Sequence, residues 1–165
     1  LSPFKGLHLL IEALAHFKAC EVELSIFGAD DGTGYADSLR QKTINNSNIH
    51  WKGVISQAIV QYEMQRHDLL CLCSTFSEMS PLVIQEARAA RIPVLASNVY
   101  GNIEQIVHGK NGLIFKMNDV MSLRKQIATI INNPYILESI SKNIQDPVLF
   151  ATISKSHSEM YKSLF

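Results

Sequence analysis

The chain has 165 residues, 47% of them hydrophobic and 8% aromatic, which suits one domain with a hydrophobic core. Its 15 Lys and Arg residues balance its 15 Asp and Glu residues, so charge alone supports neither nucleic-acid binding nor a membrane-surface role. The three cysteines form no CxxC pair, which argues against a disulfide framework or zinc site and fits a reducing, cytoplasmic setting. Cys71 and Cys73 share one face of an apolar run, and we expect them to pack as small hydrophobic side chains.

Helix-period and strand-like segments alternate along the chain. Leu10, Leu14 and Phe17 recur at helical spacing and predict a first helix, and Ser56 is the expected N-cap of a later one. The predicted helices cover residues 6–18, 35–45, 56–67, 81–90, 102–107, 119–131, a segment restarting at 133–134, and 151–164. The predicted strands cover residues 22–27, 48–52, 69–73, 92–96 and 113–115.

This alternation predicts an α/β fold in which helices cover both faces of a doubly wound parallel sheet. Ligands of such sheets bind at the carboxyl ends of the strands, so the loops after Phe27, Lys52, Cys73 and Ala96 are the candidate binding loops. No composition shift marks a second domain within residues 1–165. The chain opens abruptly without Met and has neither a signal peptide nor a run of ~20 apolar residues, so we expect a fragment of a longer protein.

The loop after Cys73 leads into a helix start with ligand-binding character. We predict that Ser80 caps this helix and that Pro81 occupies its first position. The amides of Ser80, Leu82 and Val83 would then be free, and the helix dipole would add partial positive charge beside them. Such an end suits a phosphate group.

Two glutamates flank this predicted phosphate position. Glu86 shares the helix face of Leu82 and Val83, and its carboxylate would lean toward the helix start, where its two oxygens could accept from a ribose diol. Glu78 precedes the helix and could accept hydrogen bonds from a sugar attached to the phosphate. By spacing alone, ordinary solvent-exposed glutamates explain both positions better than a site does.

Motifs along the whole chain change that balance. Glu78 and Glu86 match the E-x7-E signature of retaining group 1 (family 4) glycosyltransferases, which this chain resembles. Further matches follow in the family's order: KGLHLLIEA from Lys5, SIFG ending at Gly28, WKG ending at Gly53, His67-Asp68 through Ser74, PVLAS from Pro93, Gly101 with Glu104, and NGLIF from Asn111.

The resemblance implies a fold and a set of residue roles. It implies the Rossmann-like C-terminal half of a GT-B fold, which binds the nucleotide-sugar donor. Lys5 and Glu78 would be the catalytic residues, Lys5 on the donor diphosphate and Glu78 on the donor sugar. The remaining implied roles are the diphosphate cradle at Met79, Ser80, Pro81 and Leu82, the ribose contact at Glu86, the nucleobase slot at Gly28 and Ile55, and positions beside the site at Gly101 and Glu104.

The resemblance also implies the chemistry and the setting. A glycosyl group would pass from a UDP- or GDP-sugar to a glycan or lipid-linked acceptor with retention and without a metal or other cofactor. Polysaccharide assembly in the cytoplasm, at the inner face of the membrane, is the family's usual setting. The family's acceptor-binding N-terminal half, its first strand and an Arg on that strand precede the position of Leu1, so this chain alone would be inactive, and any membrane association would depend on that half.

Three features depart from the family pattern or leave alternatives open. Met79-Ser80-Pro81 replaces a commoner glycine-containing loop, and Tyr100 and Arg91 stand where glycine is usual. Tyr100 could narrow the donor site or pack on the surface. A nucleotide-sugar epimerase of related fold and a non-catalytic receiver-like module are the alternative functions. The six histidines are scattered, and we expect them at surfaces or helix ends.

Overall fold

A computed structural model describes residues 1–147 and 150–162 of the chain. The first half contains the 3₁₀ helix η1 (Pro3–Lys5), α1 (Leu7–Leu14), β1 (Leu24–Phe27), α2 (Tyr35–Thr43), β2 (Ile49–Gly53) and α3 (Gln57–Met64). The second half contains β3 (Leu70–Leu72), α4 (Leu82–Ala89), β4 (Val94–Ser97), α5 (Tyr100–Ile103), β5 (Leu113–Phe115), α6 (Val120–Asn132), α7 (Tyr135–Lys142) and α8 (Phe150–Lys162).

The strands are parallel, as predicted, but they form two sheets instead of one. β1 pairs with β2, and β3, β4 and β5 form the second sheet in that order. The first residues of the chain lie beside the carboxyl ends of β1 and β3, one strand of each sheet. The Leu1 amine donates to the carbonyl of Ala29, just after β1, and the Thr75 amide donates to the carbonyl of Phe4 at 2.8 Å, just after β3.

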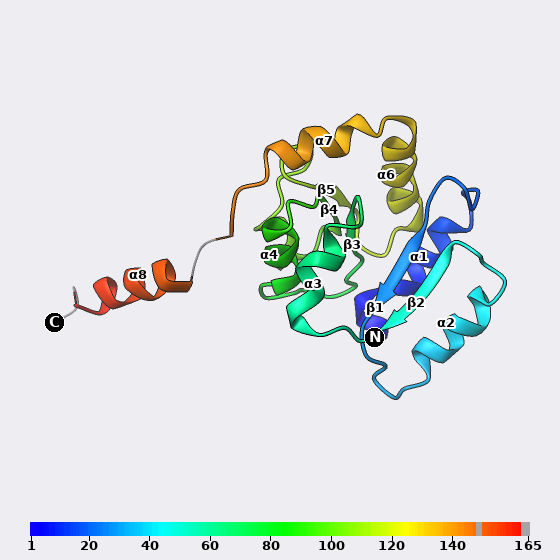
Figure 1. Cartoon of the computed structure of the whole chain (residues 1–165), viewed down its shortest axis with the longest axis horizontal. Helices are drawn as coiled ribbons and strands as arrows, with labels where there is room; N and C mark the ends of the chain where they lie inside the picture. Colours follow the sequence, from blue (N-terminus) through cyan, green and yellow to red (C-terminus); the bar gives the residue numbers. More distant parts are fainter. Residues whose placement is uncertain (148–149, 163–165) are drawn as a thin grey trace.

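Helices cover both faces of the larger sheet, which confirms the doubly wound arrangement (Figure 1). Leu95 of β4 faces one cluster, which α1, α6 and α7 complete, whereas Val94 and Ala96 face the other cluster with α4. Successive residues of a strand point to opposite faces, so a strand covered on both sides is mainly apolar. All four residues of β4 are accordingly buried, and the polar one among them is Ser97 at the end of the strand.

Local sequence signals account for several element boundaries. The Asp119 carboxylate accepts from the Ser122 amide at 2.9 Å and caps α6, as predicted. The predicted helix 102–107 is wrong: α5 begins at Tyr100, because the Asn102 side chain binds the Ser97 carbonyl at 3.0 Å and ties this turn to the end of β4.

Arg91 ends α4 at the opposite end of that helix from the predicted site. It takes a left-handed φ of 61°, the conformation for which glycine is usual. Its guanidinium binds the carbonyl of Ile144 and the carboxylate of Asp146, both at 2.6 Å. Arg91 therefore ties α4 to the segment after α7, at the opposite end of α4 from the predicted phosphate position. Among the described residues, no helix has both the length and the apolar character to cross a bilayer.

Candidate functional site

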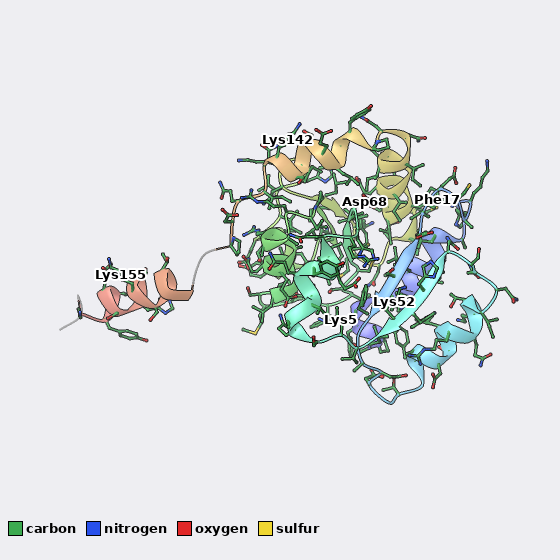
Figure 2. All side chains as sticks on the ribbon, viewed as in Figure 1. Lys5, Phe17, Lys52, Asp68, Lys142 and Lys155 are labelled. Atoms are coloured by element: carbon green, nitrogen blue, oxygen red, sulfur yellow. The ribbon has the colours of Figure 1, made fainter. Side chains whose placement is uncertain are left out.

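Lys5 and Glu78 lie together, although 72 residues separate them in the sequence. The Lys5 Nζ atom is 2.6 Å from Oε1 of Glu78, and the two side chains are 49% and 11% exposed. Lys5 follows the N-terminal segment that spans the ends of β1 and β3 (Figure 2), and Glu78 lies in the loop after β3. The structure thus brings the two predicted catalytic residues together, and as a direct ion pair.

Two glycines allow this close approach. Gly6 has a φ of 66°, and a Cβ there would collide with the carbonyl oxygen of Cys73 at the end of β3. A Cβ on Gly101 would collide with the carbonyl oxygen of Glu78. Only glycine permits both contacts. Gly101 therefore lies against the backbone of Glu78.

Buried hydrogen bonds extend from Glu78 into the core. Ser74 Oγ donates to Oε1 of Glu78 at 2.7 Å, and Ser97 Oγ donates to the carbonyl of Ser74, also at 2.7 Å. Asn102 Nδ2 in turn donates to the carbonyl of Ser97. None of these three residues was expected in the site. Polar residues at the ends of neighbouring parallel strands were the available signal, because such ends meet at one edge of a sheet.

The start of α4 differs from the prediction. Pro81, not Ser80, is the N-cap, with an extended ψ of 112°, and α4 begins at Leu82. Ser80 makes no capping bond because the helical conformation starts after Pro81, and the Pro81 carbonyl already accepts from the Ile84 amide at 3.1 Å. The amides of Leu82 and Val83 open the helix, where helical geometry supplies no acceptor. The Met79 side chain is 93% exposed beside them.

Glu86 has a partner that the sequence did not indicate. Gln57 Nε2, at the start of α3, donates to Oε1 of Glu86 at 2.8 Å. This hydrogen bond to one carboxylate oxygen holds the Glu86 side chain in place. The carboxylate predicted to contact the ribose therefore belongs to α4 and is positioned by a residue of α3.

The predicted nucleobase residues lie at the ends of the smaller sheet. The Gly28 amide donates to the carbonyl of Gly53 at 2.9 Å, which joins the ends of β1 and β2. Ile55 follows β2 and is half-buried. Among the residues beside the site, Glu104 is exposed and Tyr100 is 64% exposed at the start of α5.

Two cysteine thiols and one tyrosine hydroxyl are partly or fully buried. Cys71 and Cys73 place their sulfur atoms 3.5 Å apart, and Cys73 is buried, as predicted. The hydrogen bond between Cys73 and Cys71, together with burial, raises the pKa of the Cys73 thiol well above its usual value. Burial also raises the pKa of the Tyr35 hydroxyl, which lies 2.8 Å from Nδ1 of His8.

Two histidines lie at helix ends, as predicted: His8 is the second residue of α1, and His67 follows the end of α3. Both are half-buried, and His67 contacts the ring of Phe27. Within the described ranges, no three His, Cys, Asp or Glu side chains gather as a metal site would require.

Comparison with known proteins identifies the family. The model of the family described as "Glycosyl transferases group 1" matches residues 1–146, so the chain belongs to this family of glycosyltransferases. The match agrees with the group 1 part of the resemblance, and it gives no support to the epimerase or receiver-like alternatives.

Curated relatives agree with this assignment. The capsular polysaccharide biosynthesis glycosyltransferase CapM of Staphylococcus aureus is 27% identical over 142 residues, which are 84% of this chain and 37% of CapM. An uncharacterized glycosyltransferase of Methanocaldococcus jannaschii is 30% identical over 142 residues, 86% of this chain and 39% of the relative. The chain therefore spans less than half the length of these two relatives.

Solved structures are similar over nearly the whole chain. The Anabaena protein Alr3699/HepE, crystallised in complex with UDP-glucose, superposes with a TM-score of 0.86 at 27% identity. The alignment covers 99% of this chain and 46% of HepE. The superposition supports the α/β fold and matches this chain to less than half of a longer protein.

Proposed function

We propose that this chain is the donor-binding domain of a glycosyltransferase and that it binds a UDP- or GDP-sugar. The observation that carries the proposal is the meeting of Lys5 and Glu78 directly before α4. A cation, the first amides of a helix and an acceptor-only carboxylate match a diphosphate attached to a sugar. The likeness to HepE, which was crystallised with UDP-glucose, supports this choice of ligand.

Each group takes one part of the donor. Lys5 and the amides at Leu82 and Val83 stabilise the diphosphate as it departs, where each charge-assisted hydrogen bond contributes about 1.5–3 kcal/mol. Glu78 accepts hydroxyls of the transferred sugar, and Glu86 accepts the ribose hydroxyls. The base lies along Gly28 and Ile55. Met79, Ser80 and Pro81 form the loop that cradles the diphosphate, and Gly101 packs beside this loop against Glu78.

We further propose that the transfer retains the anomeric configuration, needs no metal ion and requires an N-terminal acceptor-binding domain of the same protein. We include in this proposal a further strand between β1 and β3. Two contacts of the N-terminal segment support it: Leu1 bonds to Ala29 just after β1, and Phe4 bonds to Thr75 just after β3. We place the reaction in polysaccharide assembly at the cytoplasmic face of the membrane. The name of CapM, a capsular polysaccharide biosynthesis glycosyltransferase, supports the polysaccharide part of this setting.

Calorimetric titration of the full-length protein with UDP and GDP tests donor binding. We expect one nucleotide to bind, and Glu86→Ala to weaken it through loss of the ribose contact. Glu12→Ala, at an exposed glutamate of α1, is the matched control and should bind as the wild type does. Failure of both nucleotides to bind would refute the proposal, and unchanged binding in Glu86→Ala would refute the ribose assignment.

Product analysis tests the reaction. Incubation with the bound nucleotide sugar and an acceptor, followed by NMR of the anomeric proton, should show a glycoside with the donor's configuration. Turnover should persist in EDTA. An inverted glycoside would contradict retention, and an epimerised nucleotide sugar would contradict glycosyl transfer altogether.

A further inference from the structure

Three polar residues to which the proposed reaction assigns no role lie in series beneath Glu78. Ser74, Ser97 and Asn102 are fully buried, each with 0% of its surface exposed. Their hydrogen bonds run in one direction, from Asn102 at the start of α5, through Ser97 at the end of β4, to Ser74 after β3 and then to the Glu78 carboxylate.

Stability does not explain this arrangement well. Burying hydroxyl and amide groups is unfavourable unless every polar atom finds a partner. Within the described residues, Oδ1 of Asn102 is a buried side-chain oxygen without a hydrogen-bond partner. A partly unsatisfied polar series inside an apolar core is typical of a functional requirement, which here would be the position of Glu78.

The geometry at Glu78 shows what the series does. Lys5 and Ser74 both donate to the same oxygen, Oε1, at 2.6 and 2.7 Å. Lys5 is half-exposed at the surface, whereas Ser74 is buried and the bond from Ser97 to its carbonyl fixes it in the core. When Lys5 turns to the diphosphate, Ser74 therefore remains as the donor that keeps the carboxylate in place.

We propose that Ser74 is a positioning residue that orients Glu78 for the donor sugar, and that Ser97 and Asn102 hold Ser74 in register. The inference rests on the proposed function, since it assumes that Glu78 contacts the sugar. A carboxylate held before binding loses less conformational freedom when it accepts sugar hydroxyls. Ser74 would thus strengthen sugar binding without touching the sugar or the nucleotide.

The test measures how much the sugar adds to binding. In the full-length protein, calorimetry gives the ratio of the affinity for UDP-glucose to that for UDP, with GDP-mannose and GDP as the second pair. We expect Ser74→Ala to lower this ratio about tenfold, the loss of one hydrogen bond to a charged group, while the affinity for the nucleotide alone stays unchanged. Ser74→Cys keeps the packing but donates weakly, so it should lower the ratio by less.

A double-mutant cycle separates positioning from general destabilisation. In the Glu78→Ala background, Ser74→Ala should change the ratio no further, because the carboxylate that it orients is absent. Thr43→Val is the matched control: Thr43 is buried, and its hydroxyl donates to the Leu39 carbonyl in α2, away from the site. This variant should lower the melting temperature and leave the ratio at its wild-type value.

The outcomes distinguish the inference from the function on which it rests. If the wild type binds neither nucleotide sugar, or if Glu78→Ala leaves the ratio unchanged, the proposed donor site is wrong and this inference fails with it. If Glu78→Ala abolishes the sugar contribution but Ser74→Ala and Ser74→Cys do not lower it, only the positioning role is overturned. Equal losses from Ser74→Ala with and without Glu78 would also overturn it.

Discussion

Replacing Glu78 by glutamine should have opposite effects on the nucleotide and on the nucleotide sugar. Without a donor, Lys5 is neutralised by Glu78 at 2.6 Å, so a diphosphate must draw Lys5 away from that carboxylate. Glu78→Gln removes the competing charge but keeps the size of the side chain. Lys5 then meets the phosphates unpaired, while the sugar loses its charged acceptor.

The exposure of the pair sets the size of the effect. The Lys5 side chain is 49% exposed, so solvent screens the attraction between Lys5 and Glu78. The ion pair therefore contributes a free energy of about 0.2–1 kcal/mol, as surface ion pairs do. Glu78→Gln should therefore tighten UDP binding by at most about fivefold. Loss of the carboxylate's bonds to the sugar is larger, about 1.5–3 kcal/mol per bond, so UDP-glucose should bind at least about tenfold more weakly relative to UDP.

Calorimetry at low and high salt measures both effects. The gain for UDP should shrink as salt is added, because ions screen the exposed pair. In Lys5→Met, the same Glu78→Gln change should no longer improve UDP binding, which makes this background the control. If Glu78→Gln weakens UDP binding at low salt, or improves it equally without Lys5, competition between Glu78 and the diphosphate for Lys5 is not the mechanism.

Three further substitutions have defined outcomes. Gly101→Ala places a Cβ against the Glu78 carbonyl, so we expect about 1–3 kcal/mol of destabilisation in thermal denaturation together with weaker UDP-glucose binding; an unchanged melting temperature would contradict this contact. Gln57→Ala frees the Glu86 carboxylate, so the affinity for UDP should fall about two- to tenfold while that for pyrophosphate stays constant, and equal losses for both ligands would refute the ribose role. Asp119→Ala removes the α6 cap and should lower the melting temperature by about 2–4 °C without altering UDP titrations; altered titrations would place α6 in the site.

The sequence predicted those features that depend on neighbours along the chain. Hydrophobic periodicity indicated that helices and strands alternate, and Asp119 was recognised as a cap because its partner lies three residues away. The predicted start of α4 was one residue too early, because Pro81 and not Ser80 is the N-cap. The extended ψ angle of Pro81 decides this, and the residue types alone do not fix that angle. The ordered family motifs located Lys5, Glu78 and Glu86 without any contact being known.

Only the tertiary structure decided how these residues meet. The pairing of Lys5 with Glu78, the bond from Gln57 to Glu86 and the buried path from Asn102 to Glu78 all join separate elements. Such contacts depend on how strands and helices pack in three dimensions, and packing at one sheet edge leaves no periodic signal in the sequence. The sequence alone therefore determined the fold class and identified the candidate site residues. The packing of β3, β4 and α5 determined that Glu78 is anchored in the core.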